Sequence, residues 1–229
     1  MMAPSGAAEV RMGYVATERV ACAGTPVNGE LRGLRMVPLG AALWTGAGRL
    51  RAQGIRGIAH AAPGSMTLQG RPGFDPTRAS VEASIRNAFT LAAAHGCRRL
   101  ALPFIAGGVF AGRIDPAIEK AELAALIVAA CHTHRGEVGA VIVAHGDEDR
   151  ALFATALAAG SVRGTTLVQG SITRVADHGC DAIANAANME VRFGGGISGV
   201  IGRATGESDE IDREAAAAIG QFWGRNGPG

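Results

Sequence analysis

Short apolar segments alternate with segments of helical periodicity from about residue 50 onward. In residues 77–95, for example, Val81, Ile85, Phe89 and Ala92 recur at the spacing that places them on one face of a helix. The same pattern predicts strands at residues 55–61, 100–105, 138–144, 165–169 and 181–184, and helices at 77–95, 115–133, 147–159 and 208–223. Residues 194–204 are predicted to form a loop that leads into a short helix.

Strands that alternate with helices predict an α/β domain with helices on both faces of a mixed, mainly parallel central sheet. Residues 1–50 are less regular, and the segments 10–20 and 34–43 either add strands or pack along an edge. The sequence Ala-Gly-Ser-Val-Arg-Gly at 159–164 is the one candidate for an internal linker. Asp115-Pro116 predicts the start of the second helix, because Asp is a common N-cap and Pro favours the first helical position.

Composition narrows the class of protein. Hydrophobic residues make up 48% of the 229 residues and charged residues 18%, which is enough apolar material for a well-filled core. The formal net charge is +2 with no basic run, so a nucleic-acid surface is not indicated. Four cysteines without CxxC spacing, and no apolar segment long enough for a membrane span, favour a cytoplasmic protein with reduced thiols.

The strongest local signal lies in residues 181–206. A predicted buried strand ends in Asn185 and Asn188, and three consecutive glycines at 194–196 then precede a helix. Glycines bring bare N–H groups close to a ligand, and the positive end of the following helix favours phosphate. Asparagine side chains both donate and accept hydrogen bonds, as a ribose diol or a carbonyl requires. Although a glycine-rich turn alone is often structural, the combination predicts a phosphate and sugar site.

A second glycine-rich loop, PFIAGGVFAG, spans residues 103–112 and also joins a strand to a helix. Ala106, Gly107 and Gly108 offer backbone donors, and Phe110 offers either an aromatic face for a sugar or base, or core packing. Two such loops at the carboxyl ends of neighbouring strands could hold a diphosphate from both sides.

These motifs resemble those of the macrodomain family, with the two halves of the family's sequence in swapped order. TGAGRL at 45–50, GIAHAAPG at 57–64 and PFIAGGVFAG resemble the family's second half. GSIT at 170–173, IANAAN at 183–188 and GGGISG at 194–199 resemble its first half. The resemblance implies a three-layer α/β/α macrodomain-like fold that is circularly permuted. Residues 1–37 form an extension or edge segment, 38–158 the second half, 159–164 the linker and 165–229 the first half.

The resemblance implies ADP-ribose as ligand, bound without metal or cofactor. Asn188 would contact the distal ribose and act in catalysis, with Asn185 beside it. Residues 194–198 would line the diphosphate and distal ribose, and residues 106–110 would form the opposing phosphate loop. Ser171 and Ile172 would lie near adenine. In full, the implied ligand-binding residues are Ser171, Ile172, Asn185, Asn188, Gly194, Gly195, Gly196, Ile197, Ser198, Ala106, Gly107, Gly108, Val109 and Phe110.

Three positions depart from the family pattern. Ser171 stands where an Asp usually accepts a hydrogen bond from adenine, and Gly202 stands where many members have His. Ser198 replaces an Asp that is proposed to activate water in hydrolase members, and serine is too weak a base for that role. Some macrodomains without this Asp nevertheless hydrolyse ADP-ribosyl esters.

Three functions therefore stay open. The first is a mono-ADP-ribosyl hydrolase acting on protein, nucleic acid that carries ADP-ribose, or O-acyl-ADP-ribose. The second is a non-catalytic reader of ADP-ribosylation, and the third is a fold redirected to another nucleotide. The oligomeric state is open as well, including exchange of halves between chains. Metal binding by Cys131, His132 and His134 is not favoured, because no second ligand cluster is evident.

Overall fold

The computed structural model describes residues 14–15, 36–160 and 164–222. Strands alternate with helices through most of this range, as the sequence pattern predicts. The strands are β1 (Tyr14–Val15), β2 (Ala41–Thr45), β3 (Ile58–Ala62), β4 (Arg99–Leu102), β5 (Gly139–Ala144), β6 (Thr165–Gln169) and β7 (Ala182–Ala186). The helices are η3 (Gly48–Gln53), α1 (Arg78–Ala94), α2 (Lys120–His134), α3 (Asp147–Gly160), α4 (Val175–His178), α5 (Gly196–Thr205) and α6 (Ser208–Phe222).

The strands form one sheet in the order β1-β2-β3-β7-β4-β5-β6. The five strands from β3 to β6 in this order run parallel, whereas β1 and β2 pair antiparallel at one edge. β7, the last strand along the described residues, therefore lies between β3 and β4. This position brings the carboxyl ends of β3, β7, β4, β5 and β6 to the same edge of the sheet.

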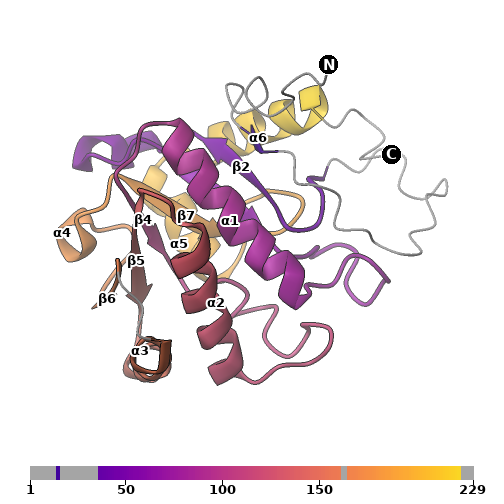
Figure 1. Ribbon diagram of the computed structural model, residues 1–229. Coiled ribbons are helices and arrows are strands. Elements are labelled where there is room, and N and C mark those ends of the chain that lie inside the picture. The colour runs from indigo at the N-terminus through magenta and orange to yellow at the C-terminus, as the bar shows by residue number, and fades with distance from the viewer. Residues whose placement is uncertain (1–13, 16–35, 161–163, 223–229) are drawn as a thin grey trace, which may run out of the picture.

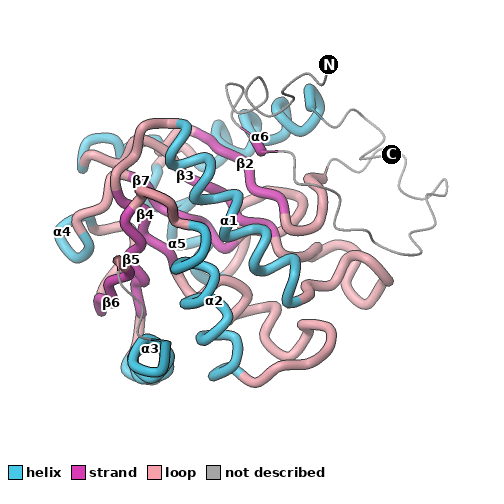
Figure 2. The backbone as a smooth tube through the Cα atoms, viewed as in Figure 1, coloured by secondary structure: helices cyan, strands magenta, loops and turns pink. Residues whose placement is uncertain are grey.

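Helices cover both faces of the sheet, which gives three layers (Figures 1 and 2). The first hydrophobic cluster joins α1, α2 and Phe153 of α3 to one face. The second face is covered by η3, α4, α5 and α6, whose buried residues include Leu50, Ile201 and Ile211. This arrangement confirms the predicted three-layer fold with a mixed, mainly parallel sheet.

The central strands are buried on both faces because their side chains alternate between the two layers. In β5, Ala140 and Ile142 belong to the cluster beneath α1 and α2. Val141 and Val143 belong to the opposite cluster. A strand that is apolar on both faces reads as a continuous apolar run, which is why β5 was predictable from its sequence.

The predicted start of the second helix at Asp115-Pro116 is wrong. Asp115 instead donates its N–H to the carbonyl oxygen of Pro76 at 2.9 Å and forms a parallel bridge with Thr77. Helix α2 begins at Lys120, where Glu119 and Glu122 form a reciprocal capping box. The Asp-Pro pair thus stabilises a long-range turn contact, which local sequence cannot distinguish from a helix cap. The short helices η3 and α4 were not predicted.

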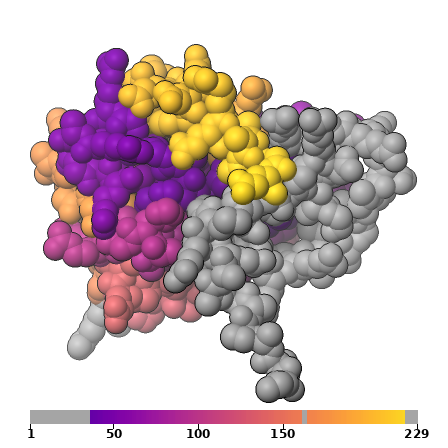
Figure 3. Space-filling model, turned by 90° about the horizontal axis from the view of Figure 1, so that it is seen from above, coloured from indigo at the N-terminus to yellow at the C-terminus, as the bar shows by residue number. Residues whose placement is uncertain are grey.

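The first and last described segments of the main body meet on the same side of the molecule. Met36 and Val37 share a hydrophobic cluster with Ala215 and Ile219 of α6. Figure 3 shows the yellow α6 directly against the indigo residues that follow position 35. Of residues 1–37, which we expected to form an extension or edge segment, Tyr14–Val15 pairs with β2 and the segment 16–35 lies outside the described residues.

Candidate functional site

Three loops leave the carboxyl ends of parallel strands at one edge of the sheet. We call them the β4 loop (residues 103–112), the β7 loop (187–195) and the β6 loop (170–174). Because β4 pairs directly with β7, their loops are neighbours. The β6 loop lies three strand positions from the β7 loop, roughly 14 Å at the usual spacing between strands. An elongated ligand could therefore contact all three loops.

The β4 loop presents unpaired backbone donors. Ala106 has a left-handed backbone with φ 59°, which is uncommon outside glycine and turns successive N–H groups to the same side. Within the described part of the chain, no hydrogen-bond partner is found for the N–H groups of Ala106, Gly108, Val109 and Phe110. Gly108 is exposed, and a Cβ added there would meet no atom within 4 Å. The loop can therefore approach a ligand with its backbone.

Helix α5 begins without a side-chain cap. Its N-cap is Gly195, which makes no capping hydrogen bond, whereas α1 and α2 both have capping boxes. The N–H groups of Gly196, Ile197 and Ser198 in the first turn have no acceptor among the described residues. Free N–H groups and the positive end of the helix dipole together favour an anion. The β4 loop and α5 thus offer backbone donors from two neighbouring strands.

Asn188 lies in the β7 loop, which leads from β7 to the α5 N-terminus, and is half-buried. Its carbonyl oxygen accepts from Val191 N–H at 3.0 Å, and its side-chain Oδ1 lies 3.4 Å from the N–H of Arg192. No partner of its Nδ2 group is found among the described residues, so this group can donate to a ligand. Val191 is buried and has φ 47°, a strained conformation for a β-branched residue. The turn that orients Asn188 is therefore maintained against local strain.

Glu190 links the β7 loop to the segment that follows β3. Its carboxylate accepts from the Ser65 hydroxyl at 2.6 Å, from Thr67 N–H at 3.1 Å and from Met66 N–H at 3.3 Å. Burial raises the pKa of Glu190, but these hydrogen bonds outweigh it and hold the pKa below the ordinary value of 4.5. Glu190 thus stays ionised at neutral pH and fixes the β7 loop.

Helix α6 anchors two further segments near the site through its acidic residues. Asp212 Oδ1 accepts from Phe193 N–H at 3.1 Å, next to the three glycines. Both carboxylate oxygens of Glu214 accept from Gly46 N–H, at 3.0 and 3.2 Å. Burial is the main cause that raises the pKa of Asp212 above its ordinary value. The acidic first half of α6 is therefore partly engaged by loop backbone.

A buried chain of hydrogen bonds lies directly beneath the α5 N-terminus. His60 of β3 and Asn185 of β7 are register partners, so their side chains project to the same face of the sheet. Asn185 Nδ2 lies 3.1 Å from His60 Nδ1 and 3.2 Å from Ser198 Oγ, and His60 Nε2 lies 2.8 Å from Thr45 Oγ1. Burial lowers the pKa of His60 from 6.5 to about 3, so its ring is neutral at physiological pH. We refer to Thr45, His60, Asn185 and Ser198 as the buried relay.

The ring of Phe193 lies 5.5 Å from the ring of His60 and also covers Gly202. A Cβ at position 202 would lie 2.8 Å from Phe193 Cγ. Phe193 thus accounts for the glycine at this position, because a larger side chain would displace the ring.

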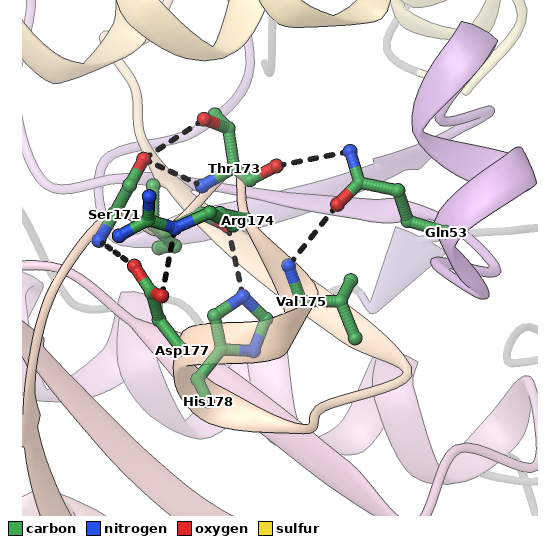
Figure 4. A network of polar contacts seen from close by, with 8 residues as sticks. Gln53, Ser171, Thr173, Arg174, Val175, Asp177 and His178 are labelled. Carbon is green, nitrogen blue, oxygen red and sulfur yellow. Dashed lines mark hydrogen bonds and ion pairs between the residues drawn. The ribbon is translucent and has the colours of Figure 1, made fainter.

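The β6 loop is held rigidly by a polar network (Figure 4). Ser171 N–H donates to Asp177 Oδ2 at 2.8 Å, and the Ser171 hydroxyl lies 2.9 Å from that of Thr173. Gln53 of η3 bridges the loop by donating to Thr173 O at 3.2 Å and accepting from Val175 N–H at 3.1 Å. The hydroxyl of Ser171 is thus partly occupied before any ligand binds.

His178 of α4 also belongs to this network, through hydrogen bonds to the backbone of Ile172 and Cys180. Its Nδ1 accepts from Cys180 N–H at 3.1 Å, so the ring proton lies on Nε2 and is donated to Ile172 O, also at 3.1 Å. Burial is the main cause that lowers the pKa of His178. The carbonyl of Ile172 is therefore engaged within the protein.

The predicted site residues differ in their exposure and fall into exposed, buried and intermediate groups. Gly194, Gly195, Gly196, Gly108 and Val109 are exposed, and Val109 retains 52% of its surface. Ala106, Phe110, Ile172 and Asn185 are buried, so they can reach a ligand only by their backbone or through another residue. For Phe110, 6% exposed, core packing is the role that its burial favours. Gly107, Ile197, Ser171 and Asn188 are intermediate, and Ser198 is 7% exposed.

Sequence reasoning missed several residues that position the site. Glu190 and Gln53 act through partners more than 100 positions away, such as the 125 positions between Ser65 and Glu190. Asp212 and Thr45 act through partners 19 and 15 positions away, on other elements. Only Glu190 could have been found from the sequence, because its carboxylate lies between Asn188 and the three glycines.

Other candidate groups lie away from this edge or are inert. His134 Nε2 pairs with Glu82 at 2.8 Å, and no group of three or more potential metal ligands occurs among the described residues. Cys180 is 3% exposed, and burial raises its pKa to about 12, which makes it a poor nucleophile. Cys97, Cys131 and Cys180 are free thiols, and Cys22 lies outside the described residues. No helix in the described ranges is long and apolar enough to cross a membrane.

Comparison with known families gives one match. The sequence model described as Macro domain matches residues 11–121. This range includes β2, β3 and β4 with the β4 loop, and ends before β7 and its loop. It begins at residue 11, earlier than position 38, where the motifs had placed the start of the domain. No curated protein and no solved structure matches the chain significantly.

Proposed function

The chain belongs to the macrodomain family of ADP-ribose-binding domains, and we propose that it removes single ADP-ribose groups from modified substrates. Binding of ADP-ribose is supported by two sets of backbone N–H groups without acceptors, one in the β4 loop and one at the α5 N-terminus. They suit a diphosphate, because several N–H groups and a helix dipole converge there. The loops fit the extended shape of ADP-ribose, with adenine at the β6 loop.

We also propose that the domain is circularly permuted. The β7 strand and its asparagine loop come last in the chain but lie in the centre of the sheet. The contact of Met36 and Val37 with α6 supports this proposal, because it keeps the two ends of the described body together. The family match supports it as well, since a linear sequence model that meets swapped halves is expected to follow only one of them.

The proposed reaction is hydrolysis at the anomeric carbon of the distal ribose. Water attacks this carbon, the bond to the substrate oxygen breaks, and ADP-ribose and the freed acid leave. Ser198 has no basicity near neutral pH, so the water is held by a phosphate of the ligand itself. Asn188 would fix the ribose through its free Nδ2 group, and the two donor sets would stabilise the phosphate charge.

The test is release of ADP-ribose from a mono-ADP-ribosylated protein carrying an ester-linked group. We predict turnover by the wild type and loss of at least roughly tenfold in Asn188→Ala, because the oriented ribose is lost. Asn87→Ala serves as a matched control, since Asn87 donates to Gly40 O away from the site. Thermal unfolding of each variant reports folding.

Unchanged turnover in a folded Asn188→Ala protein would exclude this role for Asn188. Binding of ADP-ribose without turnover by the wild type would instead identify a reader of ADP-ribosylation. The serine at position 198 favours this second candidate, because hydrolase members usually have a carboxylate there.

A further inference from the structure

Thr45 determines the direction of each hydrogen bond in the buried relay. The Thr45 hydroxyl donates to the carbonyl oxygen of Gly46 at 3.1 Å. Because the Thr45 hydroxyl has only this one proton to donate, its oxygen must accept from His60 Nε2–H at 2.8 Å. A neutral imidazole carries one ring proton, and the low pKa of His60, about 3, keeps the ring neutral. His60 Nδ1 is therefore bare and acts as an acceptor.

Asn185 continues the chain in the same direction. Its Nδ2 group donates one proton to His60 Nδ1 at 3.1 Å and the other to Ser198 Oγ at 3.2 Å. Asn185 is fully buried, and its Oδ1 has no hydrogen-bond partner. Turning the amide over would leave two N–H donors unpaired instead of one acceptor, and would also set a carbonyl oxygen against the bare His60 Nδ1. The amide is thereby fixed with its nitrogen toward Ser198.

We propose that the buried relay makes Ser198 a hydrogen-bond donor to the ligand, with Thr45, His60 and Asn185 as positioning residues. Ser198 Oγ already accepts from Asn185, so its own proton is available to an acceptor oxygen of the ligand at the α5 N-terminus. Ser198 as a residue is 7% exposed, and it lies on the helix turn whose N–H groups are free. Ser198 thus adds a fixed donor to a row of backbone donors, where the family Asp would present an acceptor.

This inference rests on the proposed binding of ADP-ribose, but its first test needs no ligand. Nitrogen NMR of the His60 ring distinguishes a protonated Nε2 from a protonated Nδ1. We expect the proton on Nε2 in the wild type, and no titration of the ring between pH 5 and 8 because its pKa is about 3. A proton on Nδ1 would require Asn185 to present its oxygen, and would overturn the relay whether or not ADP-ribose binds.

The second test reverses the relay with Asn185→Asp. A carboxylate only accepts, so Ser198 must turn its proton inward, and His60 must move its proton to Nδ1. ADP-ribose affinity, measured by calorimetry, should fall roughly 3- to 10-fold, the range for one net hydrogen bond. Ser198→Ala should lose the same factor, and the double variant should lose no more than the weaker-binding single variant. Wild-type affinity in Asn185→Asp, or losses that multiply in the double variant, would overturn the proposal.

Thr45→Val supplies a variant that introduces no buried charge. It removes the acceptor of His60 Nε2–H, so the ring proton should move to Nδ1 and ADP-ribose affinity should fall in the same range as for Asn185→Asp. Thr166→Val is the matched control, because Thr166 is an exposed strand threonine on β6 outside the relay. A folded Thr45→Val protein with wild-type tautomer and affinity would contradict the relay. If the wild type fails to bind ADP-ribose while His60 carries its proton on Nε2, the proposed function fails and the relay stands.

Discussion

Glu190 is the residue whose charge most directly connects folding to the site. Its carboxylate accepts from the Ser65 hydroxyl and from two backbone N–H groups, and so joins the β7 loop to the segment after β3. Ser65 is fully buried and itself accepts from Leu68 N–H at 3.0 Å. Removing the charge at Glu190 therefore loosens a turn on which Asn188 also depends.

We predict that Glu190→Gln lowers the free energy of unfolding at pH 7 by about 1 kcal/mol, because charge-assisted hydrogen bonds are replaced by weaker ones. Folding lowers the pKa of Glu190 from its ordinary value of 4.5, so its stabilisation is fully present above that value and is lost as pH falls through the folded pKa. Urea unfolding of the wild type and the variant at several pH values should show a difference that shrinks below about pH 4.

The control is Glu137→Gln, since Glu137 is exposed and lies beyond the end of α2, away from the site. Its effect on unfolding should be small at every pH. An equal difference between wild type and Glu190→Gln at pH 3 and pH 7 would show that the charge of Glu190 contributes nothing.

At the same scale, the relay shows why some site residues escape prediction from sequence. Asn185 was expected to contact the ligand, yet its side chain is fully buried between His60 and Ser198. His60 lies 125 positions away in the chain, and only the insertion of β7 beside β3 brings the two together. Sequence spacing did not show that the Asn185 side chain faces the buried side of β7.

At the scale of elements, α5 has no side chain that caps its N-terminus, which costs stability but leaves its first N–H groups free for a ligand. Its N-cap Gly195 has an extended backbone, φ −81° and ψ −179°, which any residue can adopt. A Cβ added at Gly195 would meet no atom within 4 Å. Glycine is therefore not required there by backbone or packing, and an open helix end is consistent with a ligand that caps it.

We predict that Gly195→Asp stabilises the fold by roughly 0.5 to 1 kcal/mol, because its carboxylate accepts from first-turn N–H groups and complements the helix dipole. The same carboxylate should weaken ADP-ribose binding roughly tenfold or more, since it occupies the donors and repels phosphate. Thermal unfolding and calorimetry measure the two effects on the same samples.

Gly195→Ser separates capping from charge. It should stabilise by a few tenths of a kcal/mol and weaken binding less than Asp does. If Gly195→Asp binds ADP-ribose as tightly as the wild type, the α5 N-terminus does not hold the phosphates.

Helices and strands were predicted correctly where their apolar residues follow a local period. The prediction failed where long-range contacts determine the bounds of an element. β6 has the predicted bounds 165–169, and α1 and α3 differ from prediction by a residue or so at their ends. The start of α2 was misplaced because Asp115 pairs with Thr77, 38 positions earlier. Helix α4 has only four residues, which is too short for a helical period to be recognised in the sequence. Its residues Asp177 and His178 nevertheless fix the β6 loop.

For the whole molecule, the proposed permutation can be tested by reversing it. A reordered chain would begin at residue 164, run to 229, continue through a Gly/Ser linker to residue 1 and end at 163. The new opening lies before Thr165, at the edge of the sheet opposite the three loops. The new join is favoured by the contact between Met36 and α6.

We predict that the reordered protein folds and binds ADP-ribose within about twofold of the natural order, because every site contact is retained. Circular dichroism and calorimetry are sufficient readouts. A reordered chain that is soluble yet lacks the native secondary structure would count against a permuted macrodomain.

Calorimetric titration with ADP-ribose, ADP and AMP tests whether the edge formed by the β4, β7 and β6 loops binds ADP-ribose. We predict clear binding of ADP-ribose, weaker binding of ADP and weakest binding of AMP, because the distal ribose and both phosphates each meet their own donors. Absence of ADP-ribose binding, or equal affinity for AMP, would contradict it and would mean that the open α5 N-terminus and the β4 loop serve another ligand.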